Sequence, residues 1–271
     1  MRDEVDVLGV PTGAPDLQSH LRQLVVESEL VARTAGPPQP PTLAIRLPSP
    51  ARGPADPLHG HEIWHATTPT AVLLGPRATR MAELLLDHLD HDGLRPLRLR
   101  MDAAEPNAGP ESTLGTLAAV CTLACWPARR RAELVAGVTA AAQTALQHLP
   151  TTRTGSTASA LRWLIRLATA FPEDPLALTP VLLQLRSYDA GSAYPVPPGQ
   201  LHAHLDGTAV GLASVHTELV CGGLAGGAVD GTTFATAIGS RHGVDAGEPG
   251  PHTVRYTARL AGDLGASLNG R

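Results

Sequence analysis

Hydrophobic and polar positions along the chain change their period several times, and each period predicts an element. Apolar residues that recur every three or four positions predict amphipathic helices, and alternation or short apolar runs predict strands. Helices are predicted at 15–35, 76–91, 127–149 and 157–171, and a wholly apolar stretch predicts a buried helix at 113–126. Strands are predicted at 5–10, 42–47, 70–75, 94–101 and 181–188.

The last third of the chain has a different pattern. Glycine-bearing turns separate short strand-like segments at 201–206, 209–220, 232–238 and 253–260, which predicts an antiparallel sheet. Earlier, the order strand 70–75, helix 76–91, strand 94–101 predicts a right-handed β-α-β crossover with parallel strands.

These elements together predict an α+β fold with a mixed sheet, central helices and a β-rich antiparallel C-terminal region. We expect three parts within one compact unit. They are an α/β part over 1–110, a helical part over 111–175 and a β-rich part over 176–271.

Composition excludes several mechanisms. The 21 basic residues counted as lysine or arginine are all arginine. Without a lysine, the chain cannot form a Schiff base with pyridoxal phosphate or a carbonyl substrate. It also cannot build a P-loop or a protein-kinase site, which both place a lysine on phosphates.

Charge and aromatic content limit the kinds of binding partner that we expect. The net charge is −4 and aromatic residues are 3% of the chain, so neither nucleic acid nor an anionic membrane is an expected partner. Three cysteines are too few for a disulfide scaffold. The first residues carry acids without a long apolar run, and the apolar segment 117–126 is too short to span a bilayer, so we expect a cytoplasmic protein.

The sequence His61-Glu62-Ile63-Trp64-His65 matches the zinc-binding pattern H-E-x-x-H, with His59 just before it. That chemistry needs a helix, which puts both imidazoles on one face. Prolines and a glycine flank the motif closely, so a strand is favoured, and in a strand the two histidines lie about 13 Å apart. We therefore predict no metal here, and keep a metal-dependent hydrolase as an alternative.

A second group of histidines and acids follows in a predicted strand. His202, His204 and Asp206 alternate and so share one face, and His216 lies on the next predicted strand with Ser214 and Glu218. Imidazole and carboxylate together suit general acid–base catalysis near neutral pH, or a divalent metal. The competing interpretation, which is the more ordinary one, is the solvent-facing polar side of a sheet.

A third candidate is the hydroxyl-rich segment 151–159, which leads into a helix. Arg153, Gly155, Ser156 and Thr157 offer a guanidinium, hydroxyls and free backbone N–H groups, a combination that suits an anion. Ordinary capping of the helix explains the same residues without a ligand.

The predicted strands over 201–220 and 232–260 resemble hot-dog domains, which act on acyl thioesters. The resemblance implies that His204 and Asp206 are the acid–base residues. It also implies that the loop 153–159 holds the phosphate of a pantetheine or coenzyme A group.

Together these patterns predict a small-molecule enzyme of the lyase, isomerase or thioesterase type that uses histidine and carboxylate. They identify no cofactor. The alternative to an enzyme is a non-catalytic accessory protein that binds another chain or forms a homodimer.

Overall fold

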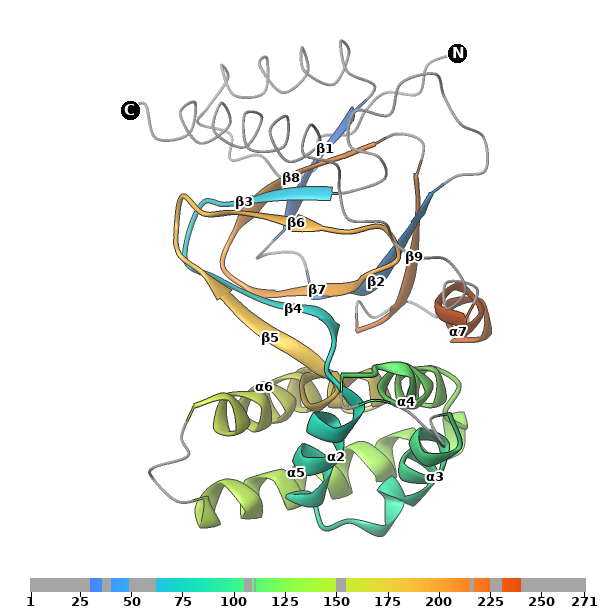
Figure 1. The fold of residues 1–271 in the computed structure, drawn as a ribbon. Coiled ribbons are helices and arrows are strands. Elements are labelled where there is room, and N and C mark those ends of the chain that lie inside the picture. Colours follow the sequence, from blue (N-terminus) through green and yellow to red (C-terminus); the bar gives the residue numbers. More distant parts are fainter. Residues whose placement is uncertain are drawn as a thin grey trace.

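The computed structural model describes residues 30–35, 40–48, 62–104, 109, 111–149, 155–214, 217–224 and 231–239. In this part of the chain, strands form two antiparallel sheets that face each other, with a layer of helices beyond one end (Figure 1). Alternating apolar and polar residues build the strands, and the facing sides of the two sheets enclose the site described below.

The first sheet has four strands. In spatial order they are β1 (Leu30–Ala35), β8 (Ala209–Ser214), β3 (Glu62–Ala66) and β6 (Ala193–Val196). The second sheet has five, in the order β5 (Leu183–Tyr188), β4 (Thr70–Pro76), β7 (Leu201–Asp206), β2 (Leu43–Pro48) and β9 (Thr217–Gly223).

Strands β3 and β7 are the inner strands that carry the site. Strand β3 pairs with β8 and β6, and β7 pairs with β4 and β2, always antiparallel. Trp64 on β3 lies opposite Gly211 on β8. A Cβ on Gly211 would come within 2.7 Å of the indole ring, so the missing side chain makes room for the tryptophan.

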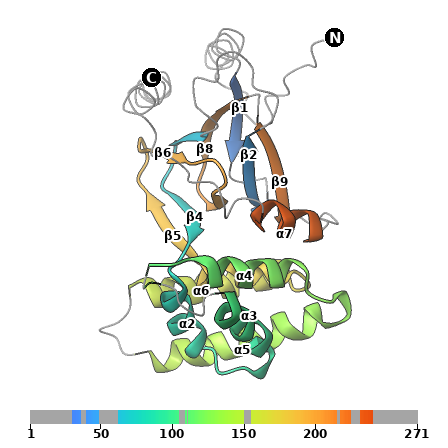
Figure 2. The same cartoon turned by 45° about the vertical axis from the view of Figure 1, so that its right-hand side comes forward.

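The helical layer is an insertion between two neighbouring strands. The chain leaves the second sheet at the end of β4 and returns to it as β5, which pairs with β4 (Figures 1 and 2). Between them lie α2 (Thr79–Asp87), η1 (Asp92–Leu94), α3 (Arg95–Ala104), α4 (Leu114–Ala124), η2 (Ala128–Arg130), α5 (Arg131–His148), α6 (Ser156–Ala170) and η4 (Pro175–Val181).

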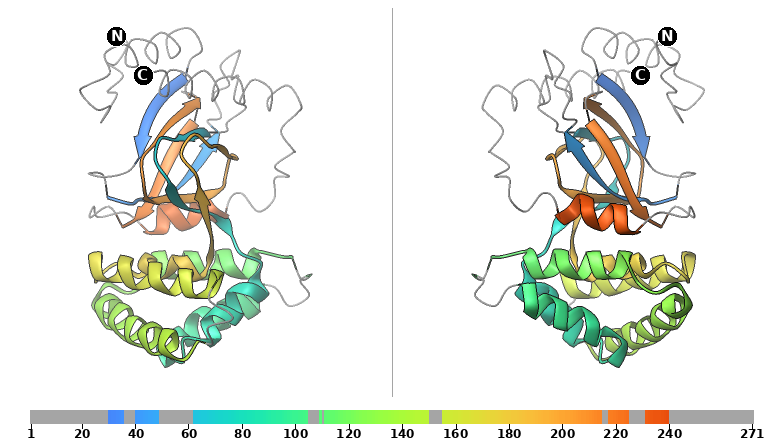
Figure 3. Two further views of the ribbon diagram at one scale, coloured as in Figure 1. Left: turned by 90° about the vertical axis from the view of Figure 1, so that its left-hand side faces the viewer. Right: turned by 90° about the vertical axis from the view of Figure 1, so that its right-hand side faces the viewer.

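Helix α7 (Gly231–Gly239) lies between the sheets and the helical layer (Figure 3). At one side it meets α4 so closely that a Cβ on Gly231 would come within 2.1 Å of the Ala124 carbonyl oxygen. At the other side Phe234 covers Gly222 on β9, where an added Cβ would meet the phenyl ring at 2.5 Å. Glycine is therefore required at both contacts.

The described residues form a large and a small apolar cluster. The large one joins helices α2 to α7 to the side of the second sheet that faces them, and it includes Leu73, Leu86, Leu123 and Leu164. The small one lies between the sheets around Trp64 and Tyr194. Burial of apolar surface therefore stabilises the helical layer far more than the space between the sheets.

The predicted α+β class is confirmed, and the strands over 42–47, 70–75, 181–188 and 201–206 are confirmed with small shifts at their ends. The helices over 76–91, 113–126, 127–149 and 157–171 are confirmed in the same way. The segments 5–10 and 253–260 lie outside the described residues.

The predicted β-α-β crossover is wrong. Residues 94–101 belong to η1 and α3, and every pairing of the described strands is antiparallel. The segment is short, and its apolar residues alternate by chance. Leu94, Leu97 and Met101 also recur at helical spacing, and all three are buried on one face of the helical segment.

Two other assignments are also wrong. Residues 232–238 form helix α7, because Phe234, Ala237 and Ile238 bury one helical face against β9 and α4. Residues 30–35, the end of a predicted helix, form strand β1, which pairs along its whole length with β8. In both places a tertiary contact overrides local pattern.

A helix must be long and apolar to span a bilayer. None in the described part of the chain is both long enough and apolar enough to cross a membrane.

Candidate active site between the two sheets

Six polar or aromatic side chains from both sheets meet in the space between them. We call this group the inter-sheet cluster; it consists of Arg46, Glu62, Trp64, Tyr194, His202 and His204. Strands β3 and β6 of the first sheet supply three of them, and β2 and β7 of the second sheet supply the rest. Alternation places Glu62 and Trp64 on one face of β3, and His202 and His204 on the facing side of β7.

Glu62 is the centre of the inter-sheet cluster. It is 1% exposed, and its two carboxylate oxygens have different partners. Arg46 Nε donates to Oε1 in a buried ion pair, and Trp64 Nε1 donates to Oε2 at 2.7 Å. Burial alone would raise the pKa of Glu62, but the charges of His202 and Arg46 and these two hydrogen bonds outweigh it, so the pKa lies below its ordinary value.

His202 faces the same carboxylate. Its Nδ1 lies 3.2 Å from the backbone oxygen of Gln200, and its Nε2 lies 3.6 Å from Glu62 Oε2. Since a carbonyl oxygen only accepts, Nδ1 carries a proton in this contact. Nε2 is therefore the ring nitrogen that faces the Glu62 carboxylate.

His204 forms the partly exposed edge of the inter-sheet cluster. Its Nε2 lies 2.8 Å from the Tyr194 hydroxyl, and its ring packs 4.2 Å from the Trp64 ring. Tyr188 stacks on Tyr194 at 4.0 Å. Burial, with help from the nearby His202, lowers the pKa of His204 to about 3, so its imidazole is neutral at physiological pH.

Arg46 has one hydrogen-bonding group left over. Its Nε contacts Glu62, and its Nη1 donates to Thr217 Oγ1 at 2.6 Å. Its Nη2 is buried and has no hydrogen-bond partner among the described residues, and the residue as a whole is 1% exposed. A buried donor without a partner is costly, and such groups mark places where a ligand atom or water completes the site.

The donor set of the inter-sheet cluster does not fit a zinc ion. A catalytic zinc needs three protein ligands from histidine, cysteine or carboxylate. Arg46 and Trp64 already occupy both Glu62 oxygens, the Tyr194 hydroxyl already contacts Nε2 of His204, and the Arg46 charge repels a cation. Throughout the described ranges, no three such residues are grouped so that they could hold a metal.

His202, His204 and Asp206, which alternation predicts on one face of a strand, have different surroundings in the structure. His202 and His204 point between the sheets, so the interpretation as a solvent-facing polar side is wrong for both. Asp206, at the end of β7, is exposed; its carboxylate lies 3.6 Å from Arg166 of α6 and accepts from the backbone N–H of Gly207. His216 lies outside the described residues.

Neither the H-E-x-x-H segment 61–65 nor the hydroxyl-rich segment 151–159 forms the site that its pattern indicated. Residues 62–66 form a strand, as the flanking prolines predict, and His59 and His61 lie outside the described residues. Of the described residues in the H-E-x-x-H segment, Glu62 and Trp64 point into the cluster. Gly155, Ser156 and Thr157 begin helix α6, where Ser159 Oγ donates to the Gly155 oxygen, and Arg153 lies outside the described part.

Sequence reasoning did not identify Arg46 and Tyr194 as site residues. The available signal was weak but physical. Arg46 is a single charge in the apolar strand 43–47, and a charge buried in a strand needs a partner. Nothing in the local pattern around Tyr194 indicates that its hydroxyl reaches His204.

Comparison with known proteins places the fold. No family model and no curated protein matches the chain. Among solved structures, the apo form of mannose 6-phosphate isomerase from Salmonella typhimurium aligns with a TM-score of 0.55 and 14% identity, over 79% of this chain and 56% of that one. The same isomerase bound to substrate (f6p) and zinc gives a TM-score of 0.56, 15% identity and coverages of 80% and 56%.

At these identities the likeness establishes the fold alone. The chain spans just over half the length of the isomerases that it matches. The two facing sheets with their inserted helical layer are therefore similar in architecture to part of mannose 6-phosphate isomerase.

Proposed function

We propose that the chain is a small-molecule isomerase that moves a proton between adjacent carbons of a hydroxy-carbonyl compound at the inter-sheet cluster. One observation carries the proposal. A buried acid–base pair, His202 and Glu62, lies beside a buried guanidinium with an unpaired N–H. The fold likeness to mannose 6-phosphate isomerase adds support for an isomerase of this kind.

The proton transfer belongs to His202. Its Nε2 takes the proton from the carbon next to the substrate carbonyl and returns it to the former carbonyl carbon. The proton of the neighbouring hydroxyl passes to the former carbonyl oxygen, so the carbonyl forms again on the neighbouring carbon. The contact of Nδ1 with the Gln200 oxygen holds the ring in the tautomer that this step needs. Glu62, which remains ionised because its pKa is lowered, stabilises the imidazolium that forms in between.

Arg46 stabilises the oxygen on which negative charge develops. When the proton leaves carbon, the carbonyl electrons move to oxygen, and an enediolate needs a positive donor at that oxygen. The unpaired Nη2 of Arg46 is such a donor, already oriented by Glu62 and Thr217. Since the cluster does not fit a zinc ion, the guanidinium supplies the positive charge, and this isomerisation is independent of metal.

The choice of first substrates follows from the structural neighbours. These neighbours are mannose 6-phosphate isomerases, one of them bound to f6p, so phosphorylated hexoses are the first compounds to test. The predicted acyl-thioester substrate lacks comparable support. One of the strands on which it rested, 232–238, is part of helix α7.

Solvent-deuterium exchange tests the proposal directly. The protein, treated with EDTA, is incubated in D₂O with mannose 6-phosphate, fructose 6-phosphate and unphosphorylated hydroxy ketones, and incorporation is followed by NMR. We expect exchange next to the carbonyl of at least one compound. We expect His202→Asn to slow it by roughly 10²–10⁴-fold, the usual contribution of a general base.

The matched control is His88→Asn, which changes an exposed histidine at the end of α2, far from the inter-sheet cluster. It should leave the exchange rate unchanged. Exchange that His202→Asn does not slow, or exchange that disappears on EDTA treatment and returns with zinc, would overturn the proposed mechanism.

A second candidate function rests on the burial of the same residues. Arg46, Glu62 and Trp64 are each at most 5% exposed, and a network so enclosed also suits a non-catalytic accessory protein. That candidate predicts no exchange with any of the compounds. It also predicts a stable complex with another chain, which light scattering after size-exclusion chromatography measures.

A further inference from the structure

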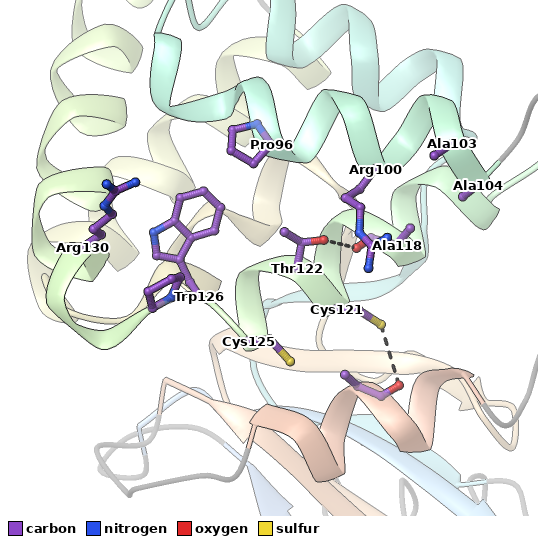
Figure 4. Close-up of a pocket in the computed structure, with 12 residues that line it drawn as sticks. Pro96, Arg100, Ala103, Ala104, Ala118, Cys121, Thr122, Cys125, Trp126 and Arg130 are labelled. Carbon is purple, nitrogen blue, oxygen red and sulfur yellow. Dashed lines mark hydrogen bonds between the residues drawn. The ribbon is translucent and has the colours of Figure 1, made fainter.

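A cavity in the helical layer is separate from the inter-sheet cluster. It has a volume of about 660 Å³ and lies where α3, α4 and η2 meet α7 (Figure 4). This volume is within the usual range for small-molecule sites, which is about 300–1,000 Å³. Its walls are mostly apolar, with prolines and alanines from α3, α4 and α7.

Two arginines are the charged residues of the cavity wall. Arg100 extends from α3 toward Ala118 and Thr122 on α4, and Arg130 lies on the far side of the Trp126 ring (Figure 4). No acidic side chain is among the described residues that line the cavity, and neither arginine forms an ion pair within the described part of the chain. The cavity therefore attracts negative charge.

The neighbouring arginine Arg98 provides a contrast on the same helix. Its Nη1 lies 3.3 Å from Asp87, and its Nη2 donates to the Leu86 oxygen at 2.9 Å. Arg98 points away from the cavity and is paired, whereas Arg100, two residues later, points into the cavity and is not.

Trp126 gives the cavity an unused donor. The residue is 9% exposed, and its indole Nε1 is buried without a hydrogen-bond partner in the described part of the chain. The ring nitrogen lies on the same side of the ring as Arg130 (Figure 4). An indole N–H can only donate, so a guanidinium cannot satisfy it, and an acceptor is missing at this end of the cavity.

The remaining polar groups of the wall are already used. Thr122 Oγ1 donates to the Ala118 oxygen at 2.7 Å, and Cys121 Sγ donates to the Ala235 oxygen at 3.8 Å. Burial raises the pKa of Cys121 to about 11, so its thiol is neutral and is neither a nucleophile nor a metal ligand at physiological pH. The free donors are therefore the two guanidinium groups and the indole N–H.

We infer that this cavity binds a small organic anion with an apolar body. The acid group accepts from Arg130 and from Trp126 Nε1, and the apolar body lies along α4 against the alanines toward Arg100. Every free polar group on the wall is a donor, which favours a carboxylate, sulfonate or phosphate over a cation or a neutral polyol. The inference does not depend on the proposed isomerase activity.

The anionic dye 8-anilino-1-naphthalenesulfonate tests this inference, because it combines an apolar body with one acid group. Its fluorescence is titrated with the full chain, with N-phenyl-1-naphthylamine as the uncharged counterpart. We expect saturable binding of one sulfonate per chain and weaker binding of the amine. Arg130→Gln should raise the Kd for the sulfonate by roughly tenfold, as expected for the loss of a hydrogen bond between charged groups.

Two further variants make the result specific. Arg129→Gln removes an exposed charge from the same turn without touching the cavity, and its Kd should stay within about twofold of the parent value. Ala118→Leu fills the cavity and should abolish binding, with an unchanged near-UV circular dichroism spectrum as the check on folding. Equal affinity in the parent and Arg130→Gln proteins, or equal binding of the uncharged amine, would overturn the inference.

Discussion

The space between the sheets and the interior of the helical layer are both buried, but different forces hold them together. Between the sheets, an ion pair and hydrogen bonds join Arg46, Glu62 and Trp64 around few apolar contacts. In the helical layer, leucines, valines and alanines from every helix pack without a buried charge pair in the described residues. A polar interior is costly, so the contrast supports the proposal that the chemistry takes place between the sheets.

The largest expected effect comes from breaking the buried ion pair. Glu62→Ala leaves the Arg46 guanidinium uncompensated and the Trp64 indole N–H unpaired. We expect it to lower the free energy of unfolding by about 3–5 kcal/mol, measured by urea denaturation. The double variant Arg46→Met/Glu62→Leu should recover most of that loss, whereas Glu218→Ala, at an exposed carboxylate on β9, should change it by less than about 0.5 kcal/mol.

A cavity in the helical layer is the next largest perturbation. Leu123 on α4 is fully buried in the large apolar cluster. Leu123→Ala should cost about 3 kcal/mol, because it removes apolar contacts and leaves a void. Unlike Glu62→Ala, it leaves no charge unpaired, so its destabilisation should not vary between pH 5 and pH 8. A strong pH dependence would contradict the division into a polar and an apolar interior.

Acidification should weaken the region between the sheets specifically. The pKa of His204 is lowered from 6.5 to about 3 in the folded protein, so between these values the unfolded chain takes up a proton that the folded chain does not. Stability is therefore complete above pH 6.5 and falls as the pH drops toward 3, and ionised Glu62 adds a further loss below 4.5. Each proton contributes at most about 1.4 kcal/mol per pH unit.

The variant His204→Gln separates the contribution of His204 to the pH dependence from that of Glu62. It removes the His204 contribution and should make the stability profile less steep between pH 6.5 and pH 4.5. The smaller loss from the lowered pKa of buried His65 and the loss below pH 4.5 should remain. The measurement is urea denaturation at half-unit intervals of pH. An unchanged profile would mean that His204 is not kept neutral by burial.

The smallest expected effect concerns the ion pair on the surface. Arg166 lies 3.6 Å from Asp206, and both side chains are more than half exposed. Asp206→Asn should change stability by less than about 1 kcal/mol, because exposed ion pairs contribute little. The same variant tests the predicted catalytic role of Asp206. We expect the deuterium exchange rate to be unchanged, and a large loss would restore Asp206 to the site.

The sequence by itself determined the local structure wherever the periodic pattern was long. The apolar residues over 113–149 and 157–171 predicted the helices α4, α5 and α6 because a helical stripe repeated over three or more turns has no alternative that buries it. The alternation in 201–206 put His202 and His204 on one face, and the absence of lysine excluded whole classes of chemistry.

Tertiary structure alone decided which way those faces point and what meets there. A two-residue period does not distinguish the inner from the outer face of a sheet, so nothing local set His202 against Glu62, or brought Arg46 from β2 to both β3 and β9. The patterns of short segments such as 94–101 and 232–238 fit a strand as well as a helix. The residues against which they pack decided that both are helical. Pairings between residues far apart in the chain are absent from any local pattern, and the contacts that join Arg46 and His202 to Glu62 are such pairings.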